Sequence, residues 1–357
     1  MNGIDDLLKQ PGAWLKVGGD TGIIVSSRVR LARNIEGRAF PGWAGEDELV
    51  RLWSDLHALV AAVPAMESPL FLEMEGVNRV DKDVLVERHL ISRDLAEKAR
   101  GSGLIVRRDE TIAIMVNEED HLRLQAMSPG LALMELWKRI DAVDTELDAR
   151  LAYAFSPRLG YLTACPSNVG TGIRASVMMH LPGLVLMNEI NCIIKAVNKI
   201  GLAVRGLWGE GTDASGNMFQ ISNQTTLGET EESIIKRLEQ IVQEIAEHER
   251  NARVRMIQKK EPSIRDHIGR AYGILSHAFL LNSKETLDLL SAMRLGMDLG
   301  LIKDWNKSVV DELFLLIQPG HLQKIEGKAI GAEKRDLVRA RLVRERILNQ
   351  KAPPLTP

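Results

Sequence analysis

Two turns that each combine glycine with arginine make the stretch from Cys165 to Glu210 the part of the chain most suited to chemistry. The first reads Cys-Pro-Ser-Asn-Val-Gly-Thr-Gly-Ile-Arg and ends at Arg174, and the second reads Arg-Gly-Leu-Trp-Gly-Glu from Arg205 to Glu210. Glycine-bearing turns at the ends of elements let side chains converge on a ligand. Two arginines, a cysteine and a carboxylate predict an anion-binding site beside a reactive or charged group.

Three successive acids, Glu118 to Asp120, follow an apolar run from Thr111 to Val116 that predicts a buried strand. Carboxylates at the end of a buried strand are costly unless a cation lies beside them, so we expect a positive group there. The alternative is an acidic helix N-terminus stabilised by the helix dipole, because a helical pattern runs from Leu131 to Ile140.

Arg28 and Arg30 follow the β-branched run Ile23-Ile24-Val25. In a strand both side chains project from one face and need anions or carboxylates as partners. A solvated edge strand is the alternative. A single histidine such as His89 is usually structural and carries little weight by itself.

Common catalytic and nucleotide-binding motifs are absent. The sequence has no G-x-x-x-x-G-K-[ST], HExxH, G-x-S-x-G or protein-kinase motif. Residues 209–214 match the letters G-x-G-x-x-A, but residues 216–221 predict a strand where a dinucleotide site needs a helix. If the protein handles phosphates, arginines are expected to bind them.

Composition favours a soluble globular protein with room for two domains: the chain has 357 residues, 45% of them hydrophobic and 26% charged, with a net charge of −2. The charge argues against a general polyanion-binding surface, and so against direct nucleic-acid binding. We find no membrane span and no signal peptide. Cys165 and Cys192 are the only cysteines, without metal-ligand spacing, which favours a reducing cytoplasm.

Local patterns predict several further elements. An amphipathic helix is expected over residues 46–63, strands over Phe71–Met74 and Val84–Val86, and a long apolar helix over Ala175–Ile200 that includes Cys192 as a buried small side chain. A long helix opens at Thr230-Glu231-Glu232. The best domain boundary is Lys259–Pro262, so we expect a catalytic domain over 1–258 and a helical domain over 259–357, with helices over 264–281, 284–299 and 309–317.

The motifs Asn117–Arg123, Cys165–Thr171 and Arg205–Glu210 together resemble the signatures of the phosphagen (guanidino) kinases, over roughly residues 23–250. The short segment before Ile23 and the additional C-terminal residues resemble the bacterial protein-arginine kinase branch. The resemblance implies an α+β fold, with an antiparallel sheet flanked by helices as in guanidino kinases and glutamine synthetase, followed by an all-helical domain. It implies ATP-dependent phosphorylation of protein arginines. The alternatives are a free-arginine kinase and a non-catalytic phosphoarginine-binding adaptor.

By the same resemblance, five arginines bind the phosphates of ATP, and His89 lies beside the nucleotide. Mg²⁺ enters bound to the nucleotide and bridges its phosphates, and no protein metal site is expected. The phosphate-binding arginines are Arg28, Arg30, Arg123, Arg174 and Arg205, within the nucleotide-binding segments Ser26, Ser27, Arg28, Val29, Arg30; Arg174, Ala175, Ser176, Val177, Met178; and Arg205, Gly206, Leu207, Trp208, Gly209, Glu210.

Glu119 and Glu210 would grip the target guanidinium, with Glu119 as the base and Glu210 aligning the other nitrogens. Two carboxylates suit this reaction because a guanidinium has no free lone pair and must lose a proton as the N–P bond forms. Cys165, as a thiolate, would polarise the same group, the alternative being a buried small side chain. The histidine that usually follows the second catalytic glutamate is replaced by Gly211.

The string Arg335, Asp336, Leu337, Val338, Arg339, Ala340 admits two interpretations. Spacing alone favours a surface helical ion pair between Asp336 and Arg339. The resemblance instead implies an allosteric phosphoarginine site, in which Arg335 and Arg339 clamp the phosphate and Asp336 takes the guanidinium. It also implies stress-linked partners: substrates with exposed arginines, Clp-type proteases, a zinc-containing activator and a heat-shock repressor, with a homodimer as the assembly.

Overall fold

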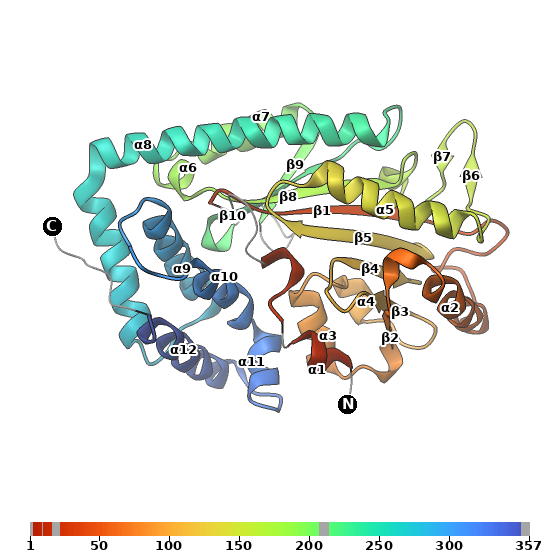
Figure 1. The fold of residues 1–357 in the computed structure, drawn as a ribbon, viewed down its shortest axis with the longest axis horizontal. Coiled ribbons are helices and arrows are strands. Elements are labelled where there is room, and N and C mark those ends of the chain that lie inside the picture. The colour runs from red at the N-terminus through yellow and green to blue at the C-terminus, as the bar shows by residue number, and fades with distance from the viewer. Residues whose placement is uncertain (1–2, 9, 16–21, 207–213, 351–357) are drawn as a thin grey trace. The chain divides into compact units, whose positions relative to one another are not determined.

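The computed structural model describes residues 3–8, 10–15, 22–206 and 214–350 (Figure 1). The chain divides into two compact units, which are described separately. The first comprises Met1–Lys16, Ser26–Val177 and Ser222–Gln240, and the second comprises Val17–Val25, Met178–Ile221 and Ile241–Pro357. Within the described residues, no helix combines the length and the apolar content that crossing a membrane requires.

Eight strands form one sheet in the order β2-β3-β4-β5-β1-β8-β10-β9. The neighbouring pairs from β2 to β1 are antiparallel, and β5 pairs β1 along its whole length, with Arg28 opposite Met127 and Arg30 opposite Gln125. The strands are β1 Ile24–Arg33, β2 Leu70–Glu73, β3 Gly103–Val106, β4 Ile112–Val116, β5 Leu122–Pro129, β8 Ile173–His180, β9 Leu202–Gly206 and β10 Met218–Asn223, with a separate hairpin of β6 Phe155–Ser156 and β7 Gly160–Tyr161.

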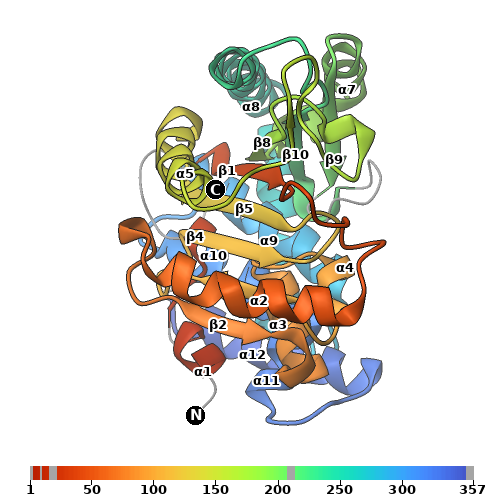
Figure 2. The same ribbon diagram turned by 90° about the vertical axis from the view of Figure 1, so that its right-hand side faces the viewer.

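The helices of the first unit cover its strands. The described α-helices that lie wholly within this unit are α1 Gly3–Leu7, α2 Glu46–Ala61, α3 Arg79–Glu87, α4 Arg93–Ala96 and α5 Leu133–Asp148. The helix α2 lies beside β2 and β3 in both views (Figures 1 and 2), and its Trp53 fits against Gly103 of β3. A Cβ at Gly103 would lie 2.5 Å from the Trp53 ring, so only glycine permits this packing.

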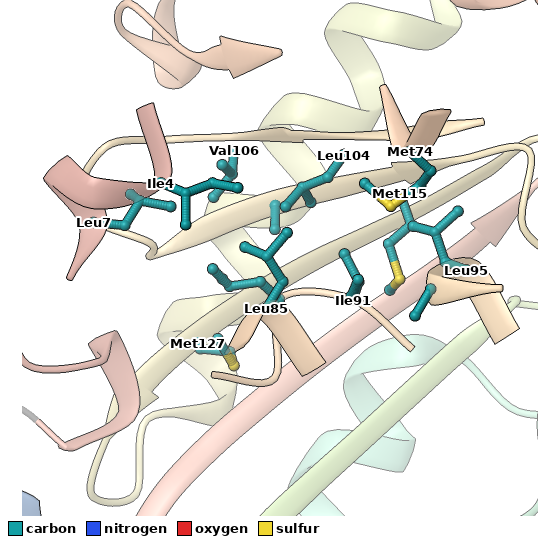
Figure 3. Close-up of a cluster of buried hydrophobic side chains, with 13 residues drawn as sticks. Ile4, Leu7, Met74, Leu85, Ile91, Leu95, Leu104, Val106, Met115 and Met127 are labelled. Carbon is teal, nitrogen blue, oxygen red and sulfur yellow. The ribbon is translucent and has the colours of Figure 1, made fainter. Parts of the chain in front are cut away.

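A hydrophobic core of the first unit lies between the sheet and α1, α3 and α4 (Figure 3). Strand residues Leu104 and Met115 pack against Leu85 of α3 and Leu95 of α4, and Ile4 of α1 closes one end. Burial of this kind contributes roughly 25 cal/mol per Å² of apolar surface and holds the sheet that carries the candidate site.

Helices dominate the C-terminal part of the chain, which confirms the predicted helical region. They are α8 Glu231–His277, α9 Ser283–Asp298, α10 Lys307–Leu316, α11 Pro319–Ile325 and α12 Ala332–Leu348. Inside α8, Lys260 leaves the helical region with φ −140° and ψ 22°, two residues before Pro262. Proline cannot donate the helical hydrogen bond and clashes with the preceding turn, which accounts for the kink.

Two predicted elements are wrong. The helix expected over Ala175–Ile200 is the strand β8 up to His180, followed by the helices α6 Pro182–Leu186 and α7 Ile190–Lys199. The strand expected over Val84–Val86 lies in α3, whose first turn is capped by Asn78: its Oδ1 accepts a hydrogen bond from the backbone N of Asp81. Cys192 lies in α7, but it is exposed rather than buried.

Candidate active site

Arg28 and Arg30 lie on β1, in the interior of the sheet between β5 and β8, so the edge-strand alternative is wrong. The predicted alternation is present: Ser27 and Val29 are buried, while Ser26, Arg28 and Arg30 are half-buried on the opposite face. The Ser27 hydroxyl donates to the carbonyl of Gly130 at 2.7 Å, which fixes β1 against the start of α5.

Four arginines of the first unit are electrostatically coupled. The pKa of Arg28 falls to about 10 because of burial and then repulsion from Arg123 and Arg174. Burial, Arg28, Arg123 and Arg174 lower the pKa of Arg30 as well. The Nε of Arg30 is buried and has no hydrogen-bond partner among the described residues. Clustered, partly desolvated guanidinium groups are stabilised by an anion, and phosphate oxygens match their geometry.

His89 lies beside this arginine cluster. Burial, followed by the charges of Arg28 and Arg30, lowers the pKa of His89 to about 3, so its ring is neutral near pH 7. The His89 carbonyl accepts a hydrogen bond from Gln125 Nε2 at 2.7 Å, and the ring centroid lies 5.2 Å from that of Trp14. Its contact with the nucleotide stays a prediction.

The three acids form a turn between β4 and β5, not a helix N-terminus. The cation expected beside them is Arg123: its Nη1 lies 2.7 Å from Glu118 Oε2 and its Nη2 lies 3.0 Å from Glu119 Oε2. Asn117 begins the turn at φ 56°, a conformation that asparagine tolerates better than most residues, and its Nδ2 donates to Gly101 O at 2.6 Å.

Glu119 is the accessible carboxylate of the pair. Its side chain is 42% exposed, whereas that of Glu118 is 1% exposed. Desolvation is the largest cause that raises the pKa of Glu119, with smaller increases from Asp120, Glu118 and Asp94, and the charge of Arg123 opposes them. A partly exposed carboxylate with a raised pKa beside an arginine cluster can accept a proton from a bound ligand.

Cys165 is half-buried, and its Sγ lies 3.1 Å from the hydroxyl oxygen of Ser167. Further along the same segment, Gly172 lets the chain pass close to β1. Gly172 has φ 67°, and a Cβ there would lie 2.7 Å from the carbonyl oxygen of Ala32. The glycine is therefore required by both conformation and space.

Arg33 anchors the same segment and was not singled out from the sequence. It is buried, pairs with Asp144 at 2.6 Å and donates to the carbonyl oxygen of Thr171 at 2.9 Å. Its guanidinium carbon lies 3.5 Å from the ring centroid of Tyr161. Only the tertiary fold brings these partners together, so no local pattern could have identified them.

Comparison with known proteins identifies the family. The profile described as "ATP:guanido phosphotransferase, C-terminal catalytic domain" matches residues 58–252, more than half of the chain. The chain belongs to the ATP:guanido phosphotransferase family. Membership makes it a kinase that uses ATP. The profile described as "Protein-arginine kinase McsB C-terminal domain" matches residues 261–356.

Curated relatives extend the match over nearly the whole chain. It is 45% identical to the protein-arginine kinase of Halothermothrix orenii, covering 92% of this chain and 94% of the relative, and 43% identical to that of Bacillus subtilis, covering 94% and 93%. Among solved structures, a duplicated taurocyamine kinase from Schistosoma mansoni aligns with a TM-score of 0.56 and 28% identity over 70% of this chain and 36% of that one. A lombricine kinase gives 0.57 and 25%, over 69% and 75%.

The other predicted nucleotide segments of this ATP:guanido phosphotransferase are placed as follows. On β8, Arg174 is half-buried, whereas Ala175, Ser176, Val177 and Met178 are buried, so a role for these four in nucleotide binding stays a prediction. On β9, Arg205 is exposed and Gly206 is buried. The rest of the segment, Leu207, Trp208, Gly209 and Glu210, together with Gly211, lies outside the described residues.

The C-terminal arginine motif lies on α12. The i, i+3 ion pair between Asp336 and Arg339 that spacing favours is present at 2.5 Å, but Arg339 is only 2% exposed, so the pair is not confined to the surface. Arg339 also donates to the carbonyl oxygens of Ile317 at 2.9 Å and Leu281 at 2.7 Å, while Arg335 donates to Ile330 O at 3.0 Å. Val338 and Ala340 are buried and Leu337 is exposed. Arg339 therefore ties α12 to the residues before α9 and after α10.

Proposed function

We propose that this kinase phosphorylates arginine side chains in proteins with MgATP as the donor. The observation that carries the proposal is the cluster of Arg28, Arg30, Arg123 and Arg174 adjoining an accessible carboxylate, Glu119. Relatives that are 43–46% identical are named protein-arginine kinase, which favours arginine in proteins over a free guanidino compound.

The arginine cluster would hold the phosphates of ATP. Charge spreads over the oxygens of the γ-phosphoryl group during transfer, so catalysis depends mainly on positioning and on neutralising that charge. Arg28 and Arg30 approach from β1, Arg123 from β5 and Arg174 from β8. Mg²⁺ enters with the nucleotide as part of the substrate.

Glu119 would act as the base. As a guanidinium nitrogen of the target attacks the γ-phosphorus, the bond from that phosphorus to the β–γ bridging oxygen breaks, ADP leaves, and the nitrogen's proton passes to the Glu119 carboxylate. Arg123 bridges the two functions, because its guanidinium contacts Glu119 and belongs to the phosphate-binding cluster. Glu210 and Cys165 would orient the remaining guanidinium nitrogens.

The proposal also gives α12 a regulatory role, based on charged side chains that could bind phosphoarginine. Arg335 and Asp336 offer a cation and a carboxylate one residue apart, which suits the opposite charges of phosphoarginine. Because Arg339 joins α12 to the residues before α9, a ligand there would act on the helical region. We further propose a cytoplasmic homodimer that marks proteins for Clp-type proteolysis in stress, with a zinc-containing activator and a heat-shock repressor as partners.

The test is phosphate transfer from MgATP to free arginine and, separately, to an unfolded protein rich in arginine, read by mass spectrometry without acid because N–P bonds are acid-labile. We expect phosphate on protein arginines. Phosphate on free arginine alone would support the metabolic kinase instead. Tight binding of phosphoarginine without transfer to either substrate would support the adaptor.

A further inference from the structure

Asp120 is a fully buried acid directly after Glu119. Its Oδ1 accepts two hydrogen bonds of 2.6 Å, one from Asn34 Nδ2 and one from the backbone N of Ala164. Its Oδ2 is also buried and has no hydrogen-bond partner among the described residues. Burying a carboxylate with an unpartnered oxygen costs free energy, so a purely structural role would be better served by a neutral side chain.

Asn34 connects the acidic turn, which contains Asp120, to two further segments: the end of β1 and the residues before Cys165. Its Nδ2 also donates to Leu162 O at 3.1 Å, and its Oδ1 accepts from the backbone N of His121 at 2.9 Å. Asn34 directly follows β1, the strand of Arg28 and Arg30. One amide group therefore links the end of β1, the acidic turn and the segment before Cys165.

His121 holds the other side of the turn. Its ring Nδ1 accepts a hydrogen bond from the backbone N of Ile35 at 3.1 Å, so its Nε2 carries the proton and donates to Ala39 O at 3.0 Å. Burial lowers the pKa of His121, which keeps this tautomer neutral. The turn is thus held to the residues after β1 at two neighbouring positions: Asp120 contacts Asn34, and His121 contacts Ile35.

We propose that Asp120 and Asn34 form a positioning pair that fixes the acidic turn, and with it Glu119, to the segment of Cys165 and to the end of β1. The inference rests on the proposed function, because it assigns Glu119 as the base. Asp120 adjoins Glu119 and Ala164 adjoins Cys165, and neighbouring Cα atoms are only about 3.8 Å apart. The Asp120–Ala164 hydrogen bond thus joins the two backbones within one residue of each reactive side chain.

The negative charge of Asp120 has a separate effect. An asparagine oxygen could accept the same two hydrogen bonds, so they do not require a carboxylate. The charged groups that act on Glu119 are Asp120, Glu118 and Asp94, which raise its pKa, and Arg123, which lowers it. A base of higher pKa accepts a proton more readily, so the charge supports the chemistry that the hydrogen bonds position.

Three variants separate position from charge. Asp120→Ala removes the acceptor and the charge, Asp120→Asn removes the charge alone, and Asn34→Ala removes the linking amide. For Asp120→Ala and Asn34→Ala we expect kcat to fall about 100-fold with KM for MgATP within about 3-fold, because the phosphate-binding arginines are retained. For Asp120→Asn we expect a loss below about 10-fold and an acid limb of kcat that moves to lower pH.

The second readout is alkylation of Cys165 by iodoacetamide, which needs no activity. A Cys192→Ser background removes the other cysteine, which is exposed. We expect alkylation to accelerate about 5-fold or more in Asp120→Ala and Asn34→Ala, because the backbone next to Cys165 is released, and to stay unchanged in Asp120→Asn. The control is Asp311→Asn, a buried acid paired with Arg294 in the second unit, which should lower Tm without changing kcat or the alkylation of Cys165.

The outcomes distinguish this inference from the proposed function. A wild type that transfers no phosphate to protein arginine contradicts the function, and the alkylation series then tests the pair by itself. A folded Asp120→Ala with the kcat and alkylation rate of wild type overturns the pair. Equal loss of kcat in Asp120→Asn and Asp120→Ala with unchanged alkylation also overturns it. Should Asp120→Ala fail to fold, the kcat and the Cys165 alkylation rate of Asn34→Ala and Asp120→Asn test the proposal in its place.

Discussion

Arg30 carries the clearest signal for an anion at the residue scale, because three arginines repel its guanidinium and its buried Nε has no hydrogen-bond partner in the described part of the chain. We expect Arg30→Met to weaken ADP binding by about 10-fold or more while leaving the protein folded, since the substitution removes a charge-assisted contact with phosphate. Isothermal titration measures this effect. Arg158→Met on the β6–β7 hairpin is the matched control, and equal affinity in the two variants would contradict the phosphate-binding role.

Glu119 has a different expected signature. Replacing it with glutamine should lower kcat by about 100-fold or more and leave KM for MgATP nearly unchanged, because a base acts in the transition state. In the wild type, kcat should fall as pH drops through the raised pKa of Glu119, so the acid limb should lie above that of an ordinary glutamate. A stopped assay across pH measures both effects. Glu118→Gln with the same kinetics as Glu119→Gln would reassign the base.

Much of the candidate site could be predicted at this scale, because the relevant residues are close in sequence. Period-two spacing placed Arg28 and Arg30 on one face, and three adjacent acids required a cation, which is Arg123. Asn34 could not be connected to Asp120, since 86 positions separate them and only the pairing of β1 with β5 brings them together.

At the scale of elements, the close approach of two segments determines which residue type a position can hold. Gly172→Ala should lower the free energy of unfolding by about 1–3 kcal/mol, because the position needs positive φ and its Cβ would meet the carbonyl oxygen of Ala32. Urea denaturation gives the difference. Gly76→Ala is the control, since nothing lies within 4 Å of a Cβ there. Equal stability of the two variants would refute this explanation.

The prediction of β8 as a helix shows where local patterns fail. Residues 175–180 are all buried, as expected for a strand in the interior of a sheet. Such a strand reads as a continuous apolar run, which cannot be distinguished from a buried helix by periodicity. The strand β4 was predicted correctly from a similar run, because it is short and rich in β-branched residues.

For the whole molecule, the compact units determine which truncated fragments of the chain are expected to fold cooperatively. The boundary predicted at Lys259 stays a prediction, but residues 178–221 and 241–357 form one unit. Within it, His180 Nε2 lies 2.8 Å from Ser291 Oγ and Gly216 N donates to Asp288 at 2.8 Å. We therefore expect a fragment of residues 1–258 to lose cooperative unfolding, measured by circular dichroism. A fragment with a sharp transition and full activity would contradict this.

The α12 site has its own test at the same scale. Asp336→Ala should abolish activation by added phosphoarginine and leave the unstimulated rate within about 2-fold, because α12 belongs to the unit without Glu119. The ratio of initial rates with and without phosphoarginine measures the effect. Asp266→Ala, an exposed acid of α8, is the control. Activation that persists in Asp336→Ala would exclude the site.

The most direct measurement compares one unfolded protein with a version in which lysine replaces every arginine, each incubated with MgATP and this kinase and mapped by mass spectrometry without acid. We expect phosphate on arginines of the first protein, none on the second, and a rate on the first protein that is lower by about 100-fold or more with Glu119→Gln. Phosphate on serine, threonine or lysine of the second protein would contradict the proposed function.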